Sequence, residues 1–242
     1  MRTPTTLRSV ETTLVLALAL AVSLPAAPAA AEDDVAPKIN LSFPGDYVRR
    51  VENDQAVLVL GYRTANLSVG ESWMLLEIAM TVKPGHDMTL TRGDFTLETP
   101  DGAVIQLASQ QDFNANTGTL RALDQRASIQ RDSLNYLPTR ANRPCRIGFF
   151  TDIATPERGM AWDQFDVNPE MGCVGRLYFE VPDGIQYGRY FLHVNLTDGE
   201  IAAPMTIMTK EELKKVKAQV KAYEKEQKQL AKEQKKQTKE EK

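Results

Sequence analysis

VGRLYFEVPDGIQYGRYFLHVNLTDGEIAAPMTIM, residues 174–208, decides the fold class of this chain. Apolar and polar residues alternate over 174–181 and again over 188–196, which is the period of a strand with one buried face. The turn-forming runs Pro-Asp-Gly at 182–184 and Asp-Gly at 198–199 separate these segments. Because another apolar-rich run follows at 201–208, the spacing predicts successive antiparallel strands joined by turns.

The same signals recur toward the N-terminus, and no alternation of strands with helices appears. Eight or nine strands are expected in all, most of them separated by turn residues. We therefore predict an all-β fold, an antiparallel immunoglobulin-like β-sandwich. The remaining predicted strands fall near residues 38–43, 55–62, 73–82, 94–99, 103–107 and 146–151.

Three of these stretches resemble the Ig-like sandwich domains of bacterial envelope and secreted proteins. They are the long central strand Trp73–Val82, the hairpin Asp94–Gly102, and Gly175–Gly184 with its Phe-Glu-Val-Pro sequence. The resemblance covers roughly residues 50–108 and 174–197. It implies an accessory or interaction domain and carries no catalytic residues.

Residues 109–172 interrupt this pattern as a polar insertion. Within it, residues 119–134 are compatible with either a short helix or a long loop over the sandwich edge. Long insertions in compact domains are often functional. Tyr136, Trp162 and Phe165 are therefore the residues that we expect to form a binding surface.

Residues 1–31 have the pattern of a secretory signal peptide. A basic start precedes an apolar run of 11 residues, 14–24, and Ala29–Ala31 fits the cleavage site. An uncleaved anchor is the alternative, but Pro25 and Pro28 would interrupt its helix. The expected mature chain begins at Glu32, has no membrane span, and is secreted or periplasmic.

Two cysteines in an exported chain indicate a disulfide between Cys145 and Cys173, the alternative being two buried thiols. No metal site is predicted, because the two histidines and two cysteines do not have the short spacings of zinc sites. Residues 163–168 offer oxygen ligands for calcium, although a polar surface loop is the favoured interpretation. His193 is expected to face solvent, opposite Leu192 and Val194.

The last segment, 209–242, differs in charge from the rest. Residues 32–208 hold 24 Asp and Glu against 15 Lys and Arg, whereas residues 209–242 hold 12 Lys and 7 Glu. Thr209 and Glu212 form a capping box, which predicts a charged C-terminal α-helix. Its apolar seam is weak and consists of Leu213, Val216, Val220, Tyr223 and Leu230.

Three roles remain open for this Lys/Glu-rich helical tail. It can be a solvated single helix, it can self-associate weakly or bind a partner helix, or it can contact an anionic polymer. Nucleic acid is disfavoured because no aromatic residues interleave with the lysines.

No catalytic signature is present, neither a nucleophile elbow nor a zinc-protease or phosphate-loop motif. The function expected from the sequence is an exported, non-enzymatic binding or structural module of the bacterial envelope. It needs no cofactor and interacts with a protein or an envelope polymer. The alternative is an enzyme or carbohydrate-active accessory domain whose site lies in the 109–172 insertion.

Overall fold

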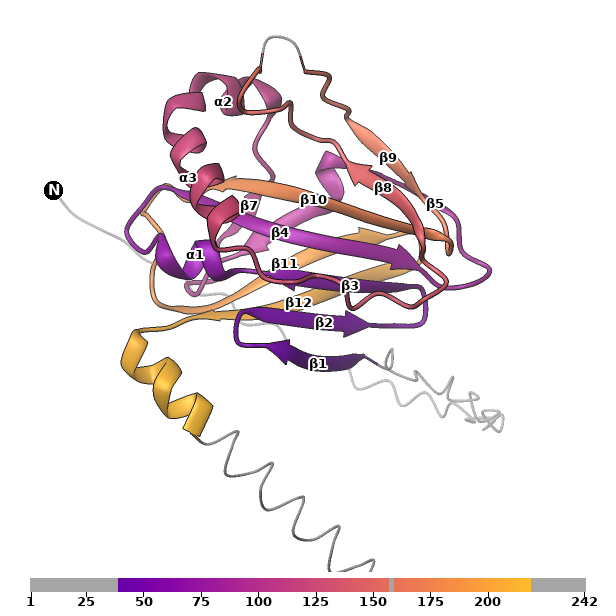
Figure 1. The fold of residues 1–242 in the computed structure, drawn as a ribbon, viewed down its shortest axis with the longest axis horizontal. Helices are drawn as coiled ribbons and strands as arrows, with labels where there is room; N and C mark the ends of the chain where they lie inside the picture. The colour runs from indigo at the N-terminus through magenta and orange to yellow at the C-terminus, as the bar shows by residue number, and fades with distance from the viewer. Residues whose placement is uncertain (1–38, 157–158, 219–242) are drawn as a thin grey trace, which may run out of the picture. The chain divides into compact units, whose positions relative to one another are not determined.

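The computed structural model describes residues 39–156 and 159–218, and its larger sheet contains six strands within them. These are β1 (Asn40–Gly45), β2 (Val48–Glu52), β3 (Ala56–Gly61), β4 (Trp73–Val82), β8 (Arg143–Ile147) and β10 (Met171–Glu180). They are hydrogen-bonded in the order β1-β2-β3-β4-β10-β8 (Figure 1). The central strand β4 is buried along its whole length, which explains why its sequence is an almost continuous apolar run.

The smaller sheet is antiparallel throughout. It contains β6 (Phe95–Glu98), β7 (Val104–Gln106), β11 (Gly188–Leu196) and β12 (Gly199–Ile207), in the order β12-β11-β6-β7. Both predicted hairpins are present. The β6–β7 turn requires Gly102, whose φ of 84° favours glycine. The β11–β12 turn begins at the predicted Asp-Gly pair.

The two sheets share one apolar core, so the prediction of a mostly-β protein built from antiparallel sheets is confirmed. Strands β12 and β2 are in contact, and Figure 1 shows β11 and β12 behind the larger sheet. This arrangement is consistent with a β-sandwich. Fully buried members of the core from the two sheets include Leu58, Leu76, Met80, Leu97, Leu192 and Ile201.

One strand pair departs from the antiparallel expectation. Strand β8 runs parallel to β10, with Cys145 opposite Cys173 and Ile147 opposite Gly175. A parallel pair needs a long crossover rather than a tight turn. Residues 148–170 provide it, and they include β9 (Gln164–Val167), which pairs with β5 (Met88–Thr91).

The insertion is helical at its start, which decides between the two alternatives left open for residues 119–134. Helices α2 (Gln110–Ala115) and α3 (Thr117–Ile129) follow one another. The Ser109 hydroxyl accepts a hydrogen bond from the Asp112 amide at 3.1 Å and so begins α2. The apolar face of α3 is buried and consists of Leu120, Leu123 and Ala127. The shorter helices α1 (Arg63–Leu67) and η1 (Arg92–Asp94) were not predicted.

The described part of the C-terminal segment, residues 210–218, is helical. The predicted capping box is present, with Glu212 Oε2 accepting from the Thr209 amide at 2.9 Å and Thr209 Oγ1 accepting from the Glu212 amide at 3.2 Å. Leu213 packs against the core, and Val216 is exposed. The other seam residues, Val220, Tyr223 and Leu230, lie outside the described residues, as does the predicted signal peptide.

Candidate functional site

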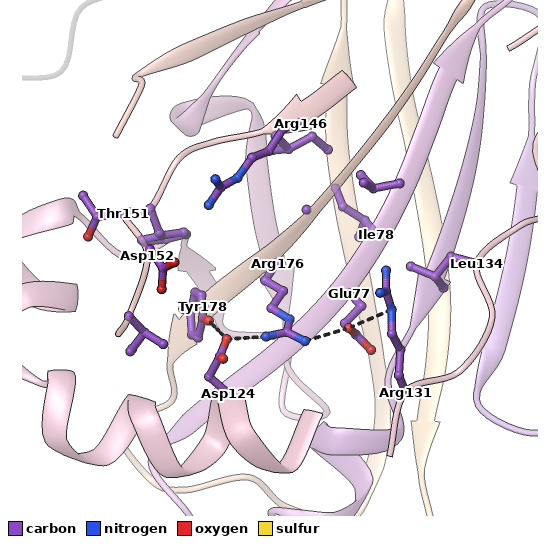
Figure 2. Close-up of a pocket in the computed structure, with 15 residues that line it drawn as sticks. Glu77, Ile78, Asp124, Arg131, Leu134, Arg146, Thr151, Asp152, Arg176 and Tyr178 are labelled. Atoms are coloured by element: carbon purple, nitrogen blue, oxygen red, sulfur yellow. Dashed lines mark hydrogen bonds and ion pairs between the residues drawn. The ribbon is translucent and has the colours of Figure 1, made fainter. Parts of the chain in front are cut away.

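A cavity of about 440 Å³ lies over the half of the larger sheet that ends at the edge strand β8. We call it the outer pocket. Strands β4, β10 and β8 form its floor, and the insertion forms its walls through α3 and two loops. Figure 2 shows the side chains that line it. They are Glu77, Ile78, Asp124, Arg131, Leu134, Arg146, Ile147, Phe150, Thr151, Asp152, Ile153, Val174, Gly175, Arg176 and Tyr178.

Arg176 is the central charge of the outer pocket. It lies opposite Glu77 in the β10–β4 register, so both side chains emerge on the same face of the sheet. One guanidinium nitrogen binds Asp124 of α3. The other lies 3.4 Å from Glu77 Oε1 and 3.1 Å from Ser128 Oγ. These contacts hold the guanidinium in one orientation and join α3 to the sheet.

Tyr178 lies two residues further along β10 and fixes the other side of Asp124. Its hydroxyl donates to Asp124 Oδ1 at 2.9 Å. The ring packs edge-on against Phe113 and Phe150, with centroids 5.1 and 5.0 Å away. Burial raises the pKa of the Tyr178 hydroxyl, and the negative charge of Asp124 adds to that effect. The phenol therefore remains a hydrogen-bond donor at neutral pH.

Glu77 is the single charged residue of strand β4. Its side chain is 11% exposed, and burial raises the pKa of the carboxyl above its ordinary value. Arg176 and Arg131 act in the opposite direction, because a nearby positive charge favours the ionised form. Arg131 is the weaker partner, with its Nε 3.9 Å from Glu77 Oε1 and a side chain that is 61% exposed.

The upper wall of the pocket carries a third arginine and a third carboxylate. Arg146 lies on β8, opposite Val174 of β10, and its guanidinium extends over the cavity in Figure 2. Asp152 lies below it, and its Oδ1 accepts from the Ala154 amide at 2.8 Å. The Thr151 hydroxyl is 3.2 Å from Gln110 Nε2. The pocket thus combines hydrogen-bond donors and acceptors around a preorganised ion pair.

Cys145 and Cys173 lie at disulfide-bonding distance, with sulfurs 2.18 Å apart, as the sequence predicted. They join β8 to β10 one residue before Arg146 and Val174. The crosslink therefore holds the edge strand that carries Arg146 against the sheet that carries Arg176.

Phe165 does not belong to the binding surface predicted from Tyr136, Trp162 and Phe165. Phe165 is buried, with its ring 5.5 Å from that of Phe149 and 6.3 Å from that of Phe95. It faces inward because β9 pairs with β5 and turns alternate residues toward the core. Tyr136 is half-buried against an apolar cluster on the larger sheet. Trp162 alone is open to solvent, with 55% of its surface exposed.

His193 lies on the outer face of β11, as expected, with Leu192 and Val194 buried on the other side. Sequence reasoning missed its partners. Nδ1 lies 2.6 Å from a Glu200 carboxylate oxygen on β12, and Nε2 lies 3.0 Å from a Glu98 oxygen on β6. The imidazole therefore links three strands of the smaller sheet.

Two further features concern metals and membranes. Over residues 39–156 and 159–218, no three His, Cys, Asp or Glu side chains gather as metal ligands would. The described helices also include none with the length and apolar character needed to cross a membrane.

Comparison of the chain with protein-family models, with curated proteins and with solved structures found no match. The outer pocket is therefore the feature of the molecule from which a function can be proposed.

Proposed function

We propose that this protein is an exported, non-enzymatic binding module of the bacterial envelope, and that the outer pocket is its binding site. The observation that carries the proposal is the convergence of charged and polar side chains on one cavity. A volume of about 440 Å³ falls within the range of ligand pockets. The Arg176 ion pair is already formed, so a ligand would meet an ordered surface and lose little entropy on binding.

The compartment is part of the same proposal. A cysteine pair at disulfide distance is consistent with an oxidising environment outside the cytoplasm. The signal-like residues 1–31 support secretion or a periplasmic location. The Ig-like character of the sandwich, suggested by the resemblance to bacterial envelope domains, fits such a module.

The charged tail belongs to the proposal as a separate element. We infer that residues 209–242 form one helix, and its described beginning has the expected capping box. Leu213 packs against the core, so the seam available for a partner begins further along, at Val216. Weak self-association or contact with a protein or envelope polymer are the roles that this helix would serve.

A second candidate function is an enzyme or carbohydrate-active accessory domain. Most of the pocket wall comes from the 109–172 insertion, where the sequence placed this alternative. Glu77 and Asp124 also differ in environment, since burial raises the pKa of Glu77 while Asp124 is held by Arg176 and Tyr178. A pair of carboxylates in different environments, one suited to act as the acid and the other to stay ionised, is typical of acid–base catalysis.

The test of the binding proposal is whether filling the pocket abolishes ligand binding. Val174 lines the pocket and is 41% exposed, so Val174→Phe would occupy part of the cavity. Val104→Phe on β7 is the matched control, because Val104 is 62% exposed and does not line the pocket. The probes are glucose, galactose, glucuronate and galacturonate, whose binding is measured by saturation-transfer NMR, and inorganic phosphate, whose binding is measured by calorimetric titration.

At least one of these probes should bind the original protein and the Val104→Phe variant but not the Val174→Phe variant. Binding that survives Val174→Phe, or no binding by any probe, would contradict the proposal. The enzyme alternative would be favoured if the original protein turns over an oligosaccharide and the Glu77→Gln variant still binds that oligosaccharide but no longer turns it over.

A further inference from the structure

The three arginines of the outer pocket are not equivalent. Arg176 is committed to Asp124, Glu77 and Ser128 on the pocket floor. Arg131 touches Glu77 only through Nε, at 3.9 Å, and this leaves its terminal nitrogens available. Arg146 makes no side-chain hydrogen bond or ion pair with any residue that the structure describes, and its guanidinium extends over the cavity (Figure 2).

Asp152 lines the same cavity as Arg146, and its carboxylate is engaged elsewhere. Its Oδ1 accepts the Ala154 amide hydrogen at 2.8 Å, and no ion pair joins it to Arg146. Two guanidinium groups therefore face the cavity from different walls with donors to spare. Arginine donors of this kind match the oxygens of a carboxylate or a phosphate.

From this arrangement we propose that the ligand of the outer pocket is a hydroxylated monoanion, an acidic sugar whose carboxylate binds Arg146. The inference rests on the proposed function of the pocket. The carboxylates of Glu77, Asp124 and Asp152 accept hydrogen bonds from sugar hydroxyls. The same carboxylates repel a second negative charge, so one carboxylate suits the site better than a dianionic phosphate.

The decisive experiment compares D-glucuronate with its neutral parent D-glucose and with inorganic phosphate by calorimetric or NMR titration. The proteins are the original chain, Arg146→Gln, and Arg143→Gln. Arg143 is the matched control because it lies on the same strand, is 59% exposed, and pairs with Glu170 at 3.5 Å outside the pocket.

Glucuronate should bind more tightly than glucose or phosphate. Arg146→Gln should weaken the binding of glucuronate about tenfold, which corresponds to the loss of one good charged contact, and should leave the affinity for glucose unchanged. Arg143→Gln should change neither. Raising the salt concentration should weaken glucuronate selectively, because partly exposed charges are screened.

Equal affinity for glucuronate and glucose would overturn the inference, as would an Arg146→Gln variant that binds glucuronate normally. Tighter binding of phosphate would also overturn it. In each of these cases, loss of probe binding in Val174→Phe would still support the pocket as the binding site. Probe binding that is unaffected by Val174→Phe would instead refute the proposed function itself.

Discussion

Ile147 of β8 occupies the space that a side chain at Gly175 of β10 would need. A Cβ added at Gly175 would lie 2.6 Å from the Ile147 Cβ and 2.8 Å from the Ile147 carbonyl oxygen. The two residues are opposite one another in the parallel β8–β10 register. The absence of a side chain at residue 175 therefore allows the edge strand β8 to lie close to β10 in the floor of the outer pocket.

Gly175→Ala should destabilise the protein by about 1–3 kcal/mol, because the clash involves backbone as well as side chain. Gly118→Ala is the control. It lies in α3 with nothing within 4 Å of an added Cβ, and alanine is the better helix former, so stability should stay equal or rise. Denaturant unfolding of both variants measures the difference. Equal stabilities would contradict the close approach of β8.

Joint replacement Cys145→Ala with Cys173→Ala should cost about 2–4 kcal/mol, because the crosslink that restricts the unfolded chain is lost. Denaturant unfolding measures this loss, and the original protein in excess reductant should unfold at the same midpoint as the double variant. Thiol titration of the unfolded, unreduced protein should find no reactive thiol. Two thiols per chain would show that the bond does not form.

Phe165→Ala should cost about 3–5 kcal/mol, since it removes a ring packed against Phe95 and Phe149 in the core. Trp162→Ala, three residues earlier, should cost less, about 1–2 kcal/mol, because 55% of that residue is exposed and only part of its ring packs against Gly148. Thermal or denaturant unfolding of the pair measures the contrast. Similar losses in the two variants would mean that Phe165 is not in the core.

The raised pKa of Glu77 predicts how the stability of the protein depends on pH. Burial raises the pKa of this carboxyl in the folded protein, so the folded state holds its proton to a higher pH than the unfolded chain. The stability that this group contributes is present at low pH and falls as the pH rises through the raised pKa. Glu77→Gln removes the titration. The stability of the variant relative to the original protein should therefore increase from acidic to neutral pH.

Melting curves over this pH range measure the relative stability. With Arg131→Gln introduced into both proteins, the relative stability of the Glu77→Gln variant should rise more steeply with pH. The reason is that Arg131 is one of the charges that lower the Glu77 pKa. A relative stability of Glu77→Gln that decreases with rising pH would mean that the ion pair with Arg176 outweighs burial.

Much of the sheet structure was predictable from the sequence because strand signals are local. The alternation at 188–196 and the turn at Asp198–Gly199 define β11 and β12 without any knowledge of the rest. The parallel placement of β8 was not predictable in this way. Its register against β10 depends on how residues 148–170 cross back over the sheet, and no local pattern encodes that path.

The outer pocket was missed for the same reason. Glu77, Asp124, Arg146 and Arg176 are far apart in the sequence and meet only because β10 lies between β4 and β8. One local signal was available, since Glu77 is the single charged residue in the apolar run Trp73–Val82. A carboxylate inside a buried strand needs a partner, and Arg176 supplies it. By contrast, the aromatic residues were predicted to be exposed from their place in the polar insertion, and Phe165 is buried.

Amide chemical-shift mapping with the same probes, D-glucuronate first, tests directly whether the outer pocket is the binding site. The account predicts that perturbed amides cluster on β4, β8 and β10 around Glu77, Arg146 and Arg176, and that the Nε–Hε signal of Arg146 shifts with them. Saturable shifts confined to β1 or to residues 209–242 would contradict this, as would the absence of shifts with every probe at millimolar concentration.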